Sequence, residues 1–401
     1  MNYADYRESI KAELSAYEKD PGQFDTDFAD YKKLDELHNN LYPLPDYLTE
    51  LTPTQRTPDW FIGKAATDVG GTTIGKLIEV LMPVGNEATN DVKRITGRNR
   101  RLKNYITEYI KQLENPFPKN IMDVEIAAVS GSILEEKLSQ LTSDFMNGDY
   151  RKQIERITKN EPVFLKTMGL VSLKENDYNI DRLMKILACV NIDEKDARQM
   201  SIDFIKAVCV SVDNVVVDST NNMIGVIEFK TDRDSTKTDL NFSNYQLLKK
   251  QLKPKFIIQM LLYSLILNVD YAWLVVLNIA SNRRANSTND FKLYLYPYNV
   301  LAGDIMNIIQ VMIITMVVYI HRFKTGVMDE EDFIEKILEI PVESIYQKLN
   351  DCSTEDIQEL QGNDNISDEI MEFLESKKSE IVFHIGRKRR FYIRQSGNVI
   401  L

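Results

Sequence analysis

Apolar and polar positions follow different periods in different parts of the chain. Residues 1–50 have the pattern of acidic helical segments that end at the proline-marked LYPLPDYL, and residues 60–150 mostly keep the three-to-four-residue apolar period of helices. The glycine-rich stretch at 70–75 and the proline-containing NPFPKN are predicted to interrupt this region. The first part of the chain is therefore predicted to be mainly helical.

A different pattern begins near residue 205. One long apolar helix is predicted at 254–268. β-branched runs, predicted to be strands, lie on either side of it at 205–217, 223–230, 273–279 and 291–297. Strands that alternate with a helix in this way predict a mixed α/β core. After residue 328 the sequence predicts an acidic helical segment and then a basic tail, and no internal repeat is found.

The most apolar stretch, IMNIIQVMIITMVVYI, occupies residues 305–320. It is shorter than the roughly 20 residues that span a bilayer, and Asn307 and Gln310 interrupt it. A buried helix is therefore predicted, and no membrane association is expected. The chain begins with acidic and polar residues that lack the apolar core of a secretory signal. Its three cysteines have no paired spacing, which favours a soluble protein in a reducing, intracellular compartment.

Composition and charge place the chain among globular proteins with local basic clusters. Of its 401 residues, 43% are apolar and 27% are charged, enough to bury a substantial core. The net charge of −11 argues against a uniformly cationic surface, although it does not locate individual patches. Two basic clusters stand out, KRITGRNRRLK at 93–103 and RKRRFYIR at 387–394.

The stretch SVDNVVVDSTNNMIGVIEFK, at residues 211–230, reads as a β-hairpin with charges on one face. Its polar DSTNN supplies the turn, and a two-residue or four-residue loop centred between the threonine and the first asparagine places Asp213 opposite Glu228. Opposed residues share one face of a sheet, and Lys230, two residues beyond Glu228, points to the same side. Two facing carboxylates repel unless a cation lies between them, and hard oxygen ligands at this spacing suit Mg²⁺.

An exposed charge pair on an edge strand is the simpler interpretation of Glu228 and Lys230. The residues that flank Glu228 are apolar, however, which indicates an interior strand, where an unpaired charge is costly. The rival aspartate, Asp218, lies at the turn and, being an odd number of residues away, on the opposite face from Asp213. The metal role is therefore assigned to Asp213.

SVD and EFK, in this order, resemble the active-site signature of the PD-(D/E)XK nucleases. Three further stretches narrow the resemblance to the YqaJ-type exonucleases, the family of phage lambda-type exonucleases. The first, QRTPDWFIGKAATDVGGT from Gln55 to Thr72, is similar to an N-terminal block of that family. Lys64 stands in this block where the family usually has arginine, so that a point charge replaces a bidentate fork.

The other two stretches lie on predicted helices. SGSILEEKL at 130–138 resembles the G-x-x-x-E helix of the family, which implies a site role for Glu135. FIIQMLLYSL at 256–265 resembles the helix after the E-x-K strand, with its inward glutamine at Gln259. The resemblance covers about residues 55–280, and the order of the elements makes it more specific than any single motif.

The resemblance implies a restriction-endonuclease-like α/β core, in which helices flank a mixed central sheet. It divides the chain into a helical N-terminal extension at 1–54 and an exonuclease-like nuclease domain at 55–325, with a catalytic core at about 125–300. Residues 326–401 form the remaining part, an acidic helical segment and a basic C-terminal tail.

Metal-dependent hydrolysis of phosphodiester bonds in double-stranded DNA is the implied chemistry. The expected metal ion is Mg²⁺, for which Mn²⁺ is expected to substitute. Its expected ligands are Asp213, Glu228, the carbonyl of Phe229 and Glu135. Lys230 then positions and activates the attacking water, because a cation beside water favours its deprotonated form. Gln259 completes the catalytic set, and histidine is not required.

Two groups of residues are expected to bind the phosphates of DNA. Lys64 and Thr72, beside the glycine-rich turn, are expected to receive a 5′-terminal phosphate at the start of a helix. Arg98, Arg100 and Arg101, in the basic run, are expected to contact the DNA backbone without sequence preference.

The family also implies a biological setting. It suggests 5′-to-3′ degradation of duplex DNA from its ends in recombination or replication, alongside a single-strand annealing protein. The length and basic tail are closer to the alkaline nucleases of large DNA viruses such as baculoviruses, and a viral source would place the protein in the host nucleus. Both a monomer and a ring-forming trimer stay open, as do endonuclease and RNA activity.

Two other functions are also open. GGTTIGKL at 70–77 satisfies the G-x-x-x-x-G-K part of a nucleotide-binding P-loop, but Leu77 stands where the Mg²⁺-binding serine or threonine is required. The stretch before it has no sustained strand pattern. A non-enzymatic DNA-binding or scaffold protein with the nuclease fold is the third hypothesis, and the presence of Asp213, Glu228 and Lys230 argues against it.

Overall fold

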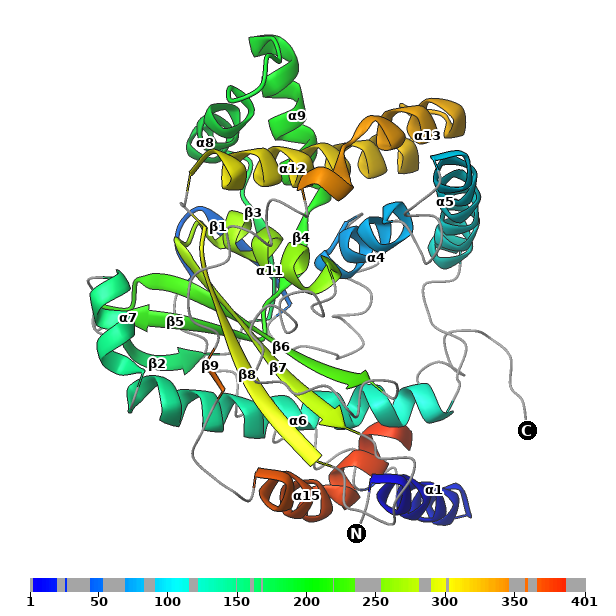
Figure 1. Cartoon of the computed structure of the whole chain (residues 1–401), viewed down its shortest axis with the longest axis vertical. Coiled ribbons are helices and arrows are strands. Elements are labelled where there is room, and N and C mark those ends of the chain that lie inside the picture. Colours follow the sequence, from blue (N-terminus) through cyan, green and yellow to red (C-terminus); the bar gives the residue numbers. More distant parts are fainter. Residues whose placement is uncertain are drawn as a thin grey trace.

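In its computed structural model, the described residues of the protein form two β-sheets and two layers of helices (Figure 1). The larger sheet lies between the helix layers, which confirms the expected mixed α/β fold. The structure describes residues 3–19, 26, 44–52, 69–82, 91–114, 122–148, 150–158, 162–166, 169–218, 220–234, 254–280, 290–300, 303–345, 358–359 and 366–386.

The larger sheet has six strands in the order β2-β5-β6-β7-β8-β9. Strands β6 and β7 are parallel, and its other neighbouring pairs are antiparallel. Helix α11 (Pro254–Leu267) lies between β6 and β7 in the chain and packs on both, as a parallel connection requires. The strands are β2 (Pro162–Lys166), β5 (Asn214–Asp218), β6 (Met223–Asp234), β7 (Tyr271–Ala280), β8 (Asp290–Asn299) and β9 (Gln358–Glu359). The last three predicted strands and the predicted helix between them are thus confirmed.

The first β-branched run is not a single strand. Its first residues complete helix α9 (Glu194–Ala207), whose buried positions Ala197, Met200 and Phe204 have helical spacing. The chain then forms β4 (Cys209–Ser211), which belongs to a three-stranded antiparallel sheet with the order β1-β3-β4. The other two strands are β1 (Leu48–Thr52) and β3 (Leu170–Leu173). The predicted strand at 205–217 was therefore wrong at its beginning, because the amphipathic helical pattern extends to Ala207.

The β5–β6 hairpin has the predicted register. Asn214 is paired with Ile227, and extending the ladder by one residue places Asp213 opposite Glu228. Beyond Asp213 every residue of β5 is buried, so the hairpin lies inside the sheet and not at its edge. An interior position for the E-x-K strand was the prediction, and it is confirmed.

The turn of this hairpin differs from the expected loop. The Asp218 N–H donates to the carbonyl of Asn222 (3.0 Å), so three residues separate the paired ends, where two or four were predicted. Asn221 has a φ of 65°, the left-handed conformation that asparagine tolerates, and the Asp218 carboxylate accepts the N–H groups of Thr220 (2.8 Å) and Asn222 (2.9 Å). An irregularity at the β6 side of the ladder restores the register beyond the turn. Asp218 is therefore a turn-forming residue, as the sequence predicted.

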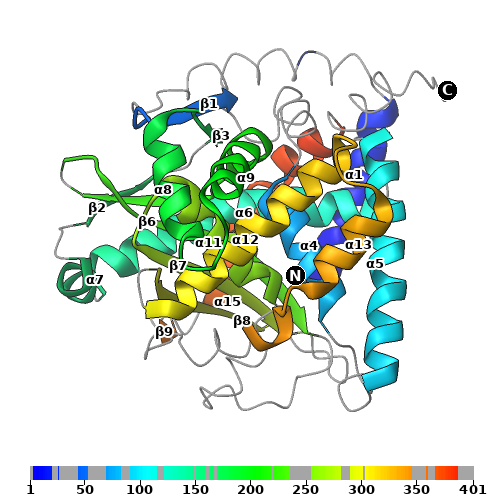
Figure 2. The same cartoon turned by 90° about the horizontal axis from the view of Figure 1, so that it is seen from above.

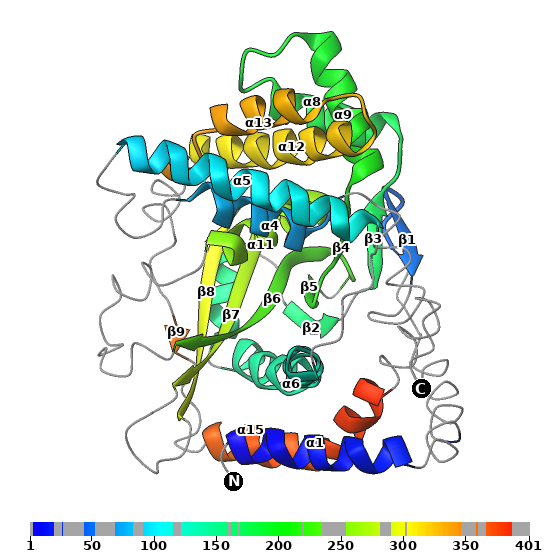
Figure 3. The same cartoon turned by 90° about the vertical axis from the view of Figure 1, so that its right-hand side faces the viewer.

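Helices lie on both sides of the larger sheet (Figure 3). The alternation of strand residues divides the core, because Val226 faces one helix layer while Ile227 and Phe229 face the other. On the Val226 side are α4 (Gly71–Leu81), α5 (Asp91–Glu114), α8 (Asp177–Leu187), α9, α11, α12 (Gly303–Lys324) and α13 (Glu330–Glu339). On the other side are α1 (Tyr3–Lys19), α6 (Met122–Asn147), α7 (Arg151–Thr158) and α15 (Ile366–Ser376).

The N-terminal region contributes to both helix and sheet. Helix α1 is confirmed within the predicted acidic helical segments, and its Tyr6, Ile10 and Leu14 are buried in the core that α6 shares. Residues 48–52, which follow the prolines of LYPLPDYL, instead form β1 and pair with β3. The residues predicted as an N-terminal extension thus contribute to the core and to the smaller sheet.

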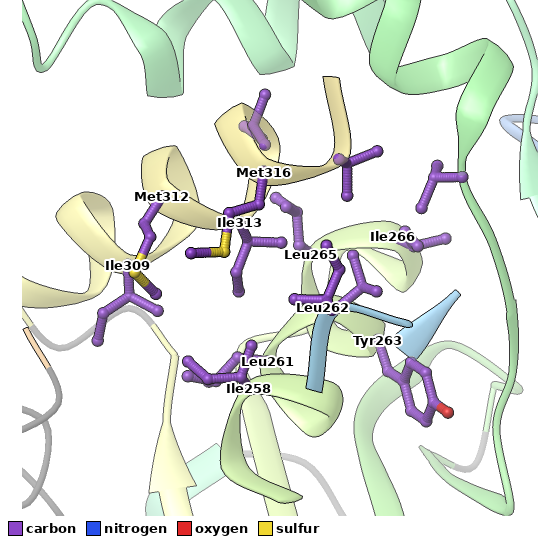
Figure 4. Packing of buried hydrophobic residues seen from close by; sticks show 14 of the residues in the cluster. Ile258, Leu261, Leu262, Tyr263, Leu265, Ile266, Ile309, Met312, Ile313 and Met316 are labelled. Carbon is purple, nitrogen blue, oxygen red and sulfur yellow. The ribbon is translucent and has the colours of Figure 1, made fainter. Parts of the chain in front are cut away.

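Helix α12 contains the most apolar stretch, and it is the buried helix that the sequence predicted. Its Ile309 and Ile313 pack against Leu261 and Leu265 of α11 (Figure 4). Ile305–Lys324 is long and apolar enough to cross a membrane by length and composition alone, with a mean hydropathy of 1.6. A core helix has the same properties, and α12 packs on α8, α9, α11 and α13.

Gly225→Ala is expected to destabilise the protein by about 1–3 kcal/mol, the range for an overpacked core. A Cβ at this position in β6 would lie 2.3 Å from the ring of Trp273 and 2.9 Å from the carbonyl oxygen of Tyr271. Gly131→Ala in α6 is the matched control, because a Cβ there meets nothing within 4 Å and alanine favours a helix by about 0.5–1 kcal/mol. Urea unfolding compares the two variants, and a Gly225→Ala protein as stable as the wild type would contradict this packing.

Candidate active site

Asp213 lies at the bend between β4 and β5, next to the central strand β6. Its side chain is 9% exposed, and its Oδ2 accepts a hydrogen bond from the N–H of Phe229 (2.8 Å). This bond replaces the ladder pairing at the end of β5 and keeps the Asp213 carboxylate beside the Glu228 strand. In a strand the N–H and carbonyl of one residue point to the same side, so the Phe229 carbonyl also points toward Asp213.

Glu228 is the most deeply buried charged residue of the described chain, with 1% exposure. Its Oε1 accepts hydrogen bonds from the ammonium group of Lys230 and from Nε2 of Gln259 (2.7 Å). Its Oε2 is buried and has no hydrogen-bond partner within the part of the chain that the structure describes. A buried carboxylate oxygen without a donor is costly, so this atom is a natural position for a cation.

Helix α11 supplies the polar side chains above this strand. Gln259 reaches Glu228 from the helix, as the resemblance implied, and its Nε2 also donates to the hydroxyl of Tyr263 (2.6 Å). Sequence reasoning missed Tyr263, although its position four residues after Gln259 places both on one face of the helix. The Lys230 ammonium lies 5.9 Å from the centre of the Phe256 ring, one helical turn earlier.

Glu135 reaches the site from α6, which packs on the other side of the sheet. Asn214, next to Asp213, donates a hydrogen bond to Ser139, one helical turn beyond Glu135, and so fixes α6 at the end of β5. From this position the Glu135 charge acts on both Glu228 and Lys230. Its neighbour Glu136 is exposed and forms an ion pair with Lys377 (3.1 Å). Of the two adjacent glutamates, Glu135 thus acts on the site and Glu136 pairs with a lysine outside it.

The electrostatics of the cluster show an excess of negative charge. Burial, together with the carboxylates of Asp213 and Glu135, raises the pKa of Glu228 well above its usual value although Lys230 acts to lower it. Burial lowers the pKa of Lys230, but the carboxylates of Glu228, Asp213 and Glu135 outweigh this effect and raise it. Burial therefore dominates the shift of the Glu228 pKa, whereas the surrounding carboxylates dominate that of the Lys230 pKa.

The donor set fits a hard divalent cation in chemistry, though the described residues do not form a preassembled metal site. No group of three His, Cys, Asp or Glu side chains within the described ranges has the arrangement of a metal centre. The hydrogen bonds to Asp213 Oδ2 and Glu228 Oε1 engage one oxygen of each carboxylate. The bare Glu228 Oε2, the Phe229 carbonyl and the surplus of carboxylates are the features that suit Mg²⁺.

The start of α4 lies against the same network. The helix begins at Gly71 after an extended Gly70, and a Cβ on Gly71 would lie 2.6 Å from Cγ of Gln259. Thr72, in the first turn, is exposed. Lys64, which was expected to bind the same phosphate as Thr72, lies outside the described residues.

The glycine-rich stretch is therefore not a loop over its full length. Only Gly70 precedes the helix, whereas Gly75 and Lys76 lie inside α4. In a P-loop the residues between the two glycines cradle phosphates before the helix starts, so this geometry contradicts the nucleotide-binding alternative. The predicted break at 70–75 is confirmed only at its first residue.

The basic run at 93–103 lies on α5, which runs beside α13 (Figure 2). Arg101 donates to the carbonyls of Val80 (3.0 Å) and Met82 (2.9 Å) at the C-terminal end of α4. Arg98 is partly buried and approaches the carbonyl of Leu338 in α13 (3.4 Å). These two arginines are engaged in the fold of the protein itself, which leaves the exposed Arg100 as the better candidate for a contact with DNA. The second basic cluster, 387–394, lies outside the described residues.

Comparisons with models of protein families, with curated proteins and with solved structures find no match to the chain. The function is therefore argued from the side chains that the fold brings together. These are Glu135, Asp213, Glu228, Lys230 and Gln259 from the predicted set, and Tyr263 in addition.

Glu228→Gln is expected to change the pH dependence of stability in a defined direction. The folded-state pKa of Glu228 is raised, so the stability that this group contributes is present below its unfolded pKa of about 4.3 and is lost as pH rises toward the folded value. The variant lacks this titration. The stability of the wild type minus that of Glu228→Gln should therefore fall between pH 5 and the raised pKa.

Urea unfolding of both proteins at several pH values measures this difference. A difference that is independent of pH would contradict the raised pKa of Glu228.

Proposed function

We propose that this protein is a Mg²⁺-dependent deoxyribonuclease with a PD-(D/E)XK core that acts on the ends of double-stranded DNA. The observation that carries the proposal is the convergence of Asp213, Glu228 and Lys230 on one face of the hairpin, with Glu228 Oε2 buried and unpartnered among the described residues. A buried acidic pair beside a lysine is what a metal-activated hydrolysis requires.

The arrangement of elements supports the same proposal. The E-x-K strand β6 is central in the sheet. It pairs on one side with β5, which begins directly after Asp213, and on the other side with the parallel strand β7, to which α11 connects it. Glutamine from α11 and glutamate from α6 approach the strand from opposite sides of the sheet. This is the order of elements that the resemblance to the YqaJ-type exonucleases implies.

The balance of charge supports a divalent cation in the site. Glu135, Asp213 and Glu228 bring three negative charges to a poorly solvated place in which Lys230 supplies one positive charge. A magnesium ion would neutralise the excess, and it takes oxygen ligands from carboxylates, carbonyls, water and substrate phosphate. When bound, it lowers the pKa of a water molecule and neutralises charge on the phosphate that is attacked.

Each residue of the site has a role in this proposal. Asp213, Glu228 and the Phe229 carbonyl hold the metal, and Glu135 completes the acidic set or orients water. Lys230 positions the attacking water and stabilises its deprotonated form. Gln259 holds the Glu228 carboxylate in place through its hydrogen bond of 2.7 Å.

The start of α4 is proposed to receive the end of the substrate. Gly71, the first residue of this helix, lies against Gln259, and Thr72 is exposed in its first turn, where helix N–H groups point toward a bound anion. With Lys64 before it, this helix start suits a terminal 5′-phosphate, which supports degradation from 5′ ends. Partnership with a single-strand annealing protein and a viral source are parts of the same proposal and rest on the resemblance alone.

Replacing Asp213 by Asn, Glu228 by Gln or Lys230 by Met is expected to lower Mg²⁺-dependent cleavage by about 100-fold or more. Glu135→Gln should also lower activity, whereas its neighbour Glu136→Gln should not, because Glu136 is exposed and paired with Lys377. The assay compares end-labelled linear duplex with closed circular DNA.

Activity on linear DNA alone is expected for an exonuclease. Absence of cleavage by the folded wild type with Mg²⁺ or Mn²⁺, together with retained DNA binding, would favour the non-catalytic alternative.

Arg100→Ala is expected to weaken DNA binding without loss of stability. It should flatten the dependence of log affinity on log salt by about 0.9 for each phosphate that the protein no longer neutralises. Arg101→Ala is the matched comparison, and it should lose stability by about 1 kcal/mol or more because the carbonyls of Val80 and Met82 lose a charged donor.

Binding to blunt duplex DNA is measured at several salt concentrations with Ca²⁺ in place of Mg²⁺ to suppress turnover. A salt dependence in Arg100→Ala equal to that of the wild type would remove this residue from the DNA surface.

A further inference from the structure

The amide group of Gln259 is shared between two acceptors. Its Nε2 donates to Oε1 of Glu228 (2.7 Å) and to the hydroxyl of Tyr263 (2.6 Å). An amide nitrogen has two protons, so both bonds can form at the same time. Because Oε1 of Glu228 accepts this bond, the donor end of the amide faces Glu228. The two bonds therefore hold the Gln259 side chain in one rotamer, with its donor directed at the carboxylate.

Gly71, at the start of α4, packs directly against the side chains of Gln259 and Tyr263. A Cβ on Gly71 would lie 2.6 Å from Cγ of Gln259 and 2.9 Å from Cε1 of Tyr263. Both distances are shorter than side-chain carbon atoms can approach, so only glycine leaves room for the two side chains as they stand. The first turn of α4 is thus in direct contact with the group that orients Glu228.

Tyr263 is fixed in place by burial. It is 4% exposed and lies within the core that α4, α11 and α12 share. On α11 it points away from Ile309 and Met312 of α12, so it belongs to the face that meets the start of α4 (Figure 4). Because the ring cannot move into solvent, its hydroxyl is a rigid acceptor for Gln259.

We propose that Tyr263 is a positioning residue that, with the bare backbone of Gly71, holds the amide of Gln259 against Glu228 and so sets the affinity of the site for its metal ion. The inference rests on the proposed function. Tyr263 does not touch the metal or the substrate. It acts through Gln259, as residues behind a metal ligand do when they orient it.

Tyr263→Phe removes the hydroxyl and keeps the ring. The second proton of the Gln259 amide then has no acceptor in a poorly solvated place, and the side chain is free to leave Glu228. The affinity for Mn²⁺ in the absence of DNA is expected to fall about 10-fold, the lower end of the range for residues behind a metal ligand. The metal concentration required for half-maximal cleavage should rise, whereas the rate of cleavage at saturating metal should change much less.

Tyr105→Phe is the matched control. Tyr105 on α5 also packs beside α4, but its hydroxyl donates to the carbonyl of Thr73 (3.3 Å) and does not reach Gln259. Its removal should leave Mn²⁺ affinity unchanged. Gly71→Ala disturbs the same network from the α4 side and should weaken Mn²⁺ binding in the same direction as Tyr263→Phe.

Calorimetric titration of the full-length proteins with MnCl₂, alongside their thermal unfolding, tests the inference. Weaker binding in both network variants with unchanged binding in Tyr105→Phe supports it. Should Tyr263→Phe fail to fold, Gly71→Ala alone decides. Mn²⁺ binding by the wild type and equal binding by the network variants would overturn the positioning role and leave the nuclease proposal intact. A folded wild type that binds no Mn²⁺ would overturn the nuclease proposal and this inference together.

Discussion

Burial of the Glu228 carboxylate in the central strand is the constraint on which the rest of the site depends. A charge at 1% exposure is stable only when partners surround it, and here each partner comes from a different part of the chain. Lys230 comes from the same strand and Gln259 from α11, whereas the Asp213 carboxylate at the bend before β5 acts against the Glu228 charge. The strand and the helix crossover must both be correctly placed before this one carboxylate has its donors. Even then one of its oxygens has no donor among the described residues.

The layered architecture explains how the surrounding residues reach the strand. Alternation along β6 directs Glu228 toward α11 and Phe229 toward α6. Helix α4 supports α11 from behind, and the contact at Gly71 joins its first turn to Gln259 and Tyr263. Helix α6 packs on the face of the sheet opposite α11 and brings Glu135 near the start of β5. The apolar helix α12 covers α11, so that the polar face of α11 is held toward the strand by packing on its apolar face.

Charges outside the site have mainly structural roles in the part of the chain that the structure describes. Arg101 binds the carbonyls that end α4, and Arg98 approaches a carbonyl of α13. Lys377 and Lys137 join the C-terminal helical region to α6 through Glu136 and Glu369. A run of arginines in a sequence is therefore weak evidence for a nucleic-acid surface, because long cationic side chains also satisfy the carbonyls at helix ends. With a net charge of −11, the proposed binding of DNA would require the remaining exposed cations to face the substrate.

The sequence by itself determined the local features of this protein. Alternation and turn residues predicted the opposition of Asp213 and Glu228, although not the length of the turn, and apolar periodicity predicted the helix with Gln259, because strand and helix periods are local properties of the chain. Only the tertiary structure decided which side chains from different helices and strands contact one another. It gave Gln259 its partner Tyr263, started α4 at Gly71 and turned Arg98 and Arg101 inward. Those outcomes depend on packing between segments distant in sequence, where periodicity gives no information about the partner.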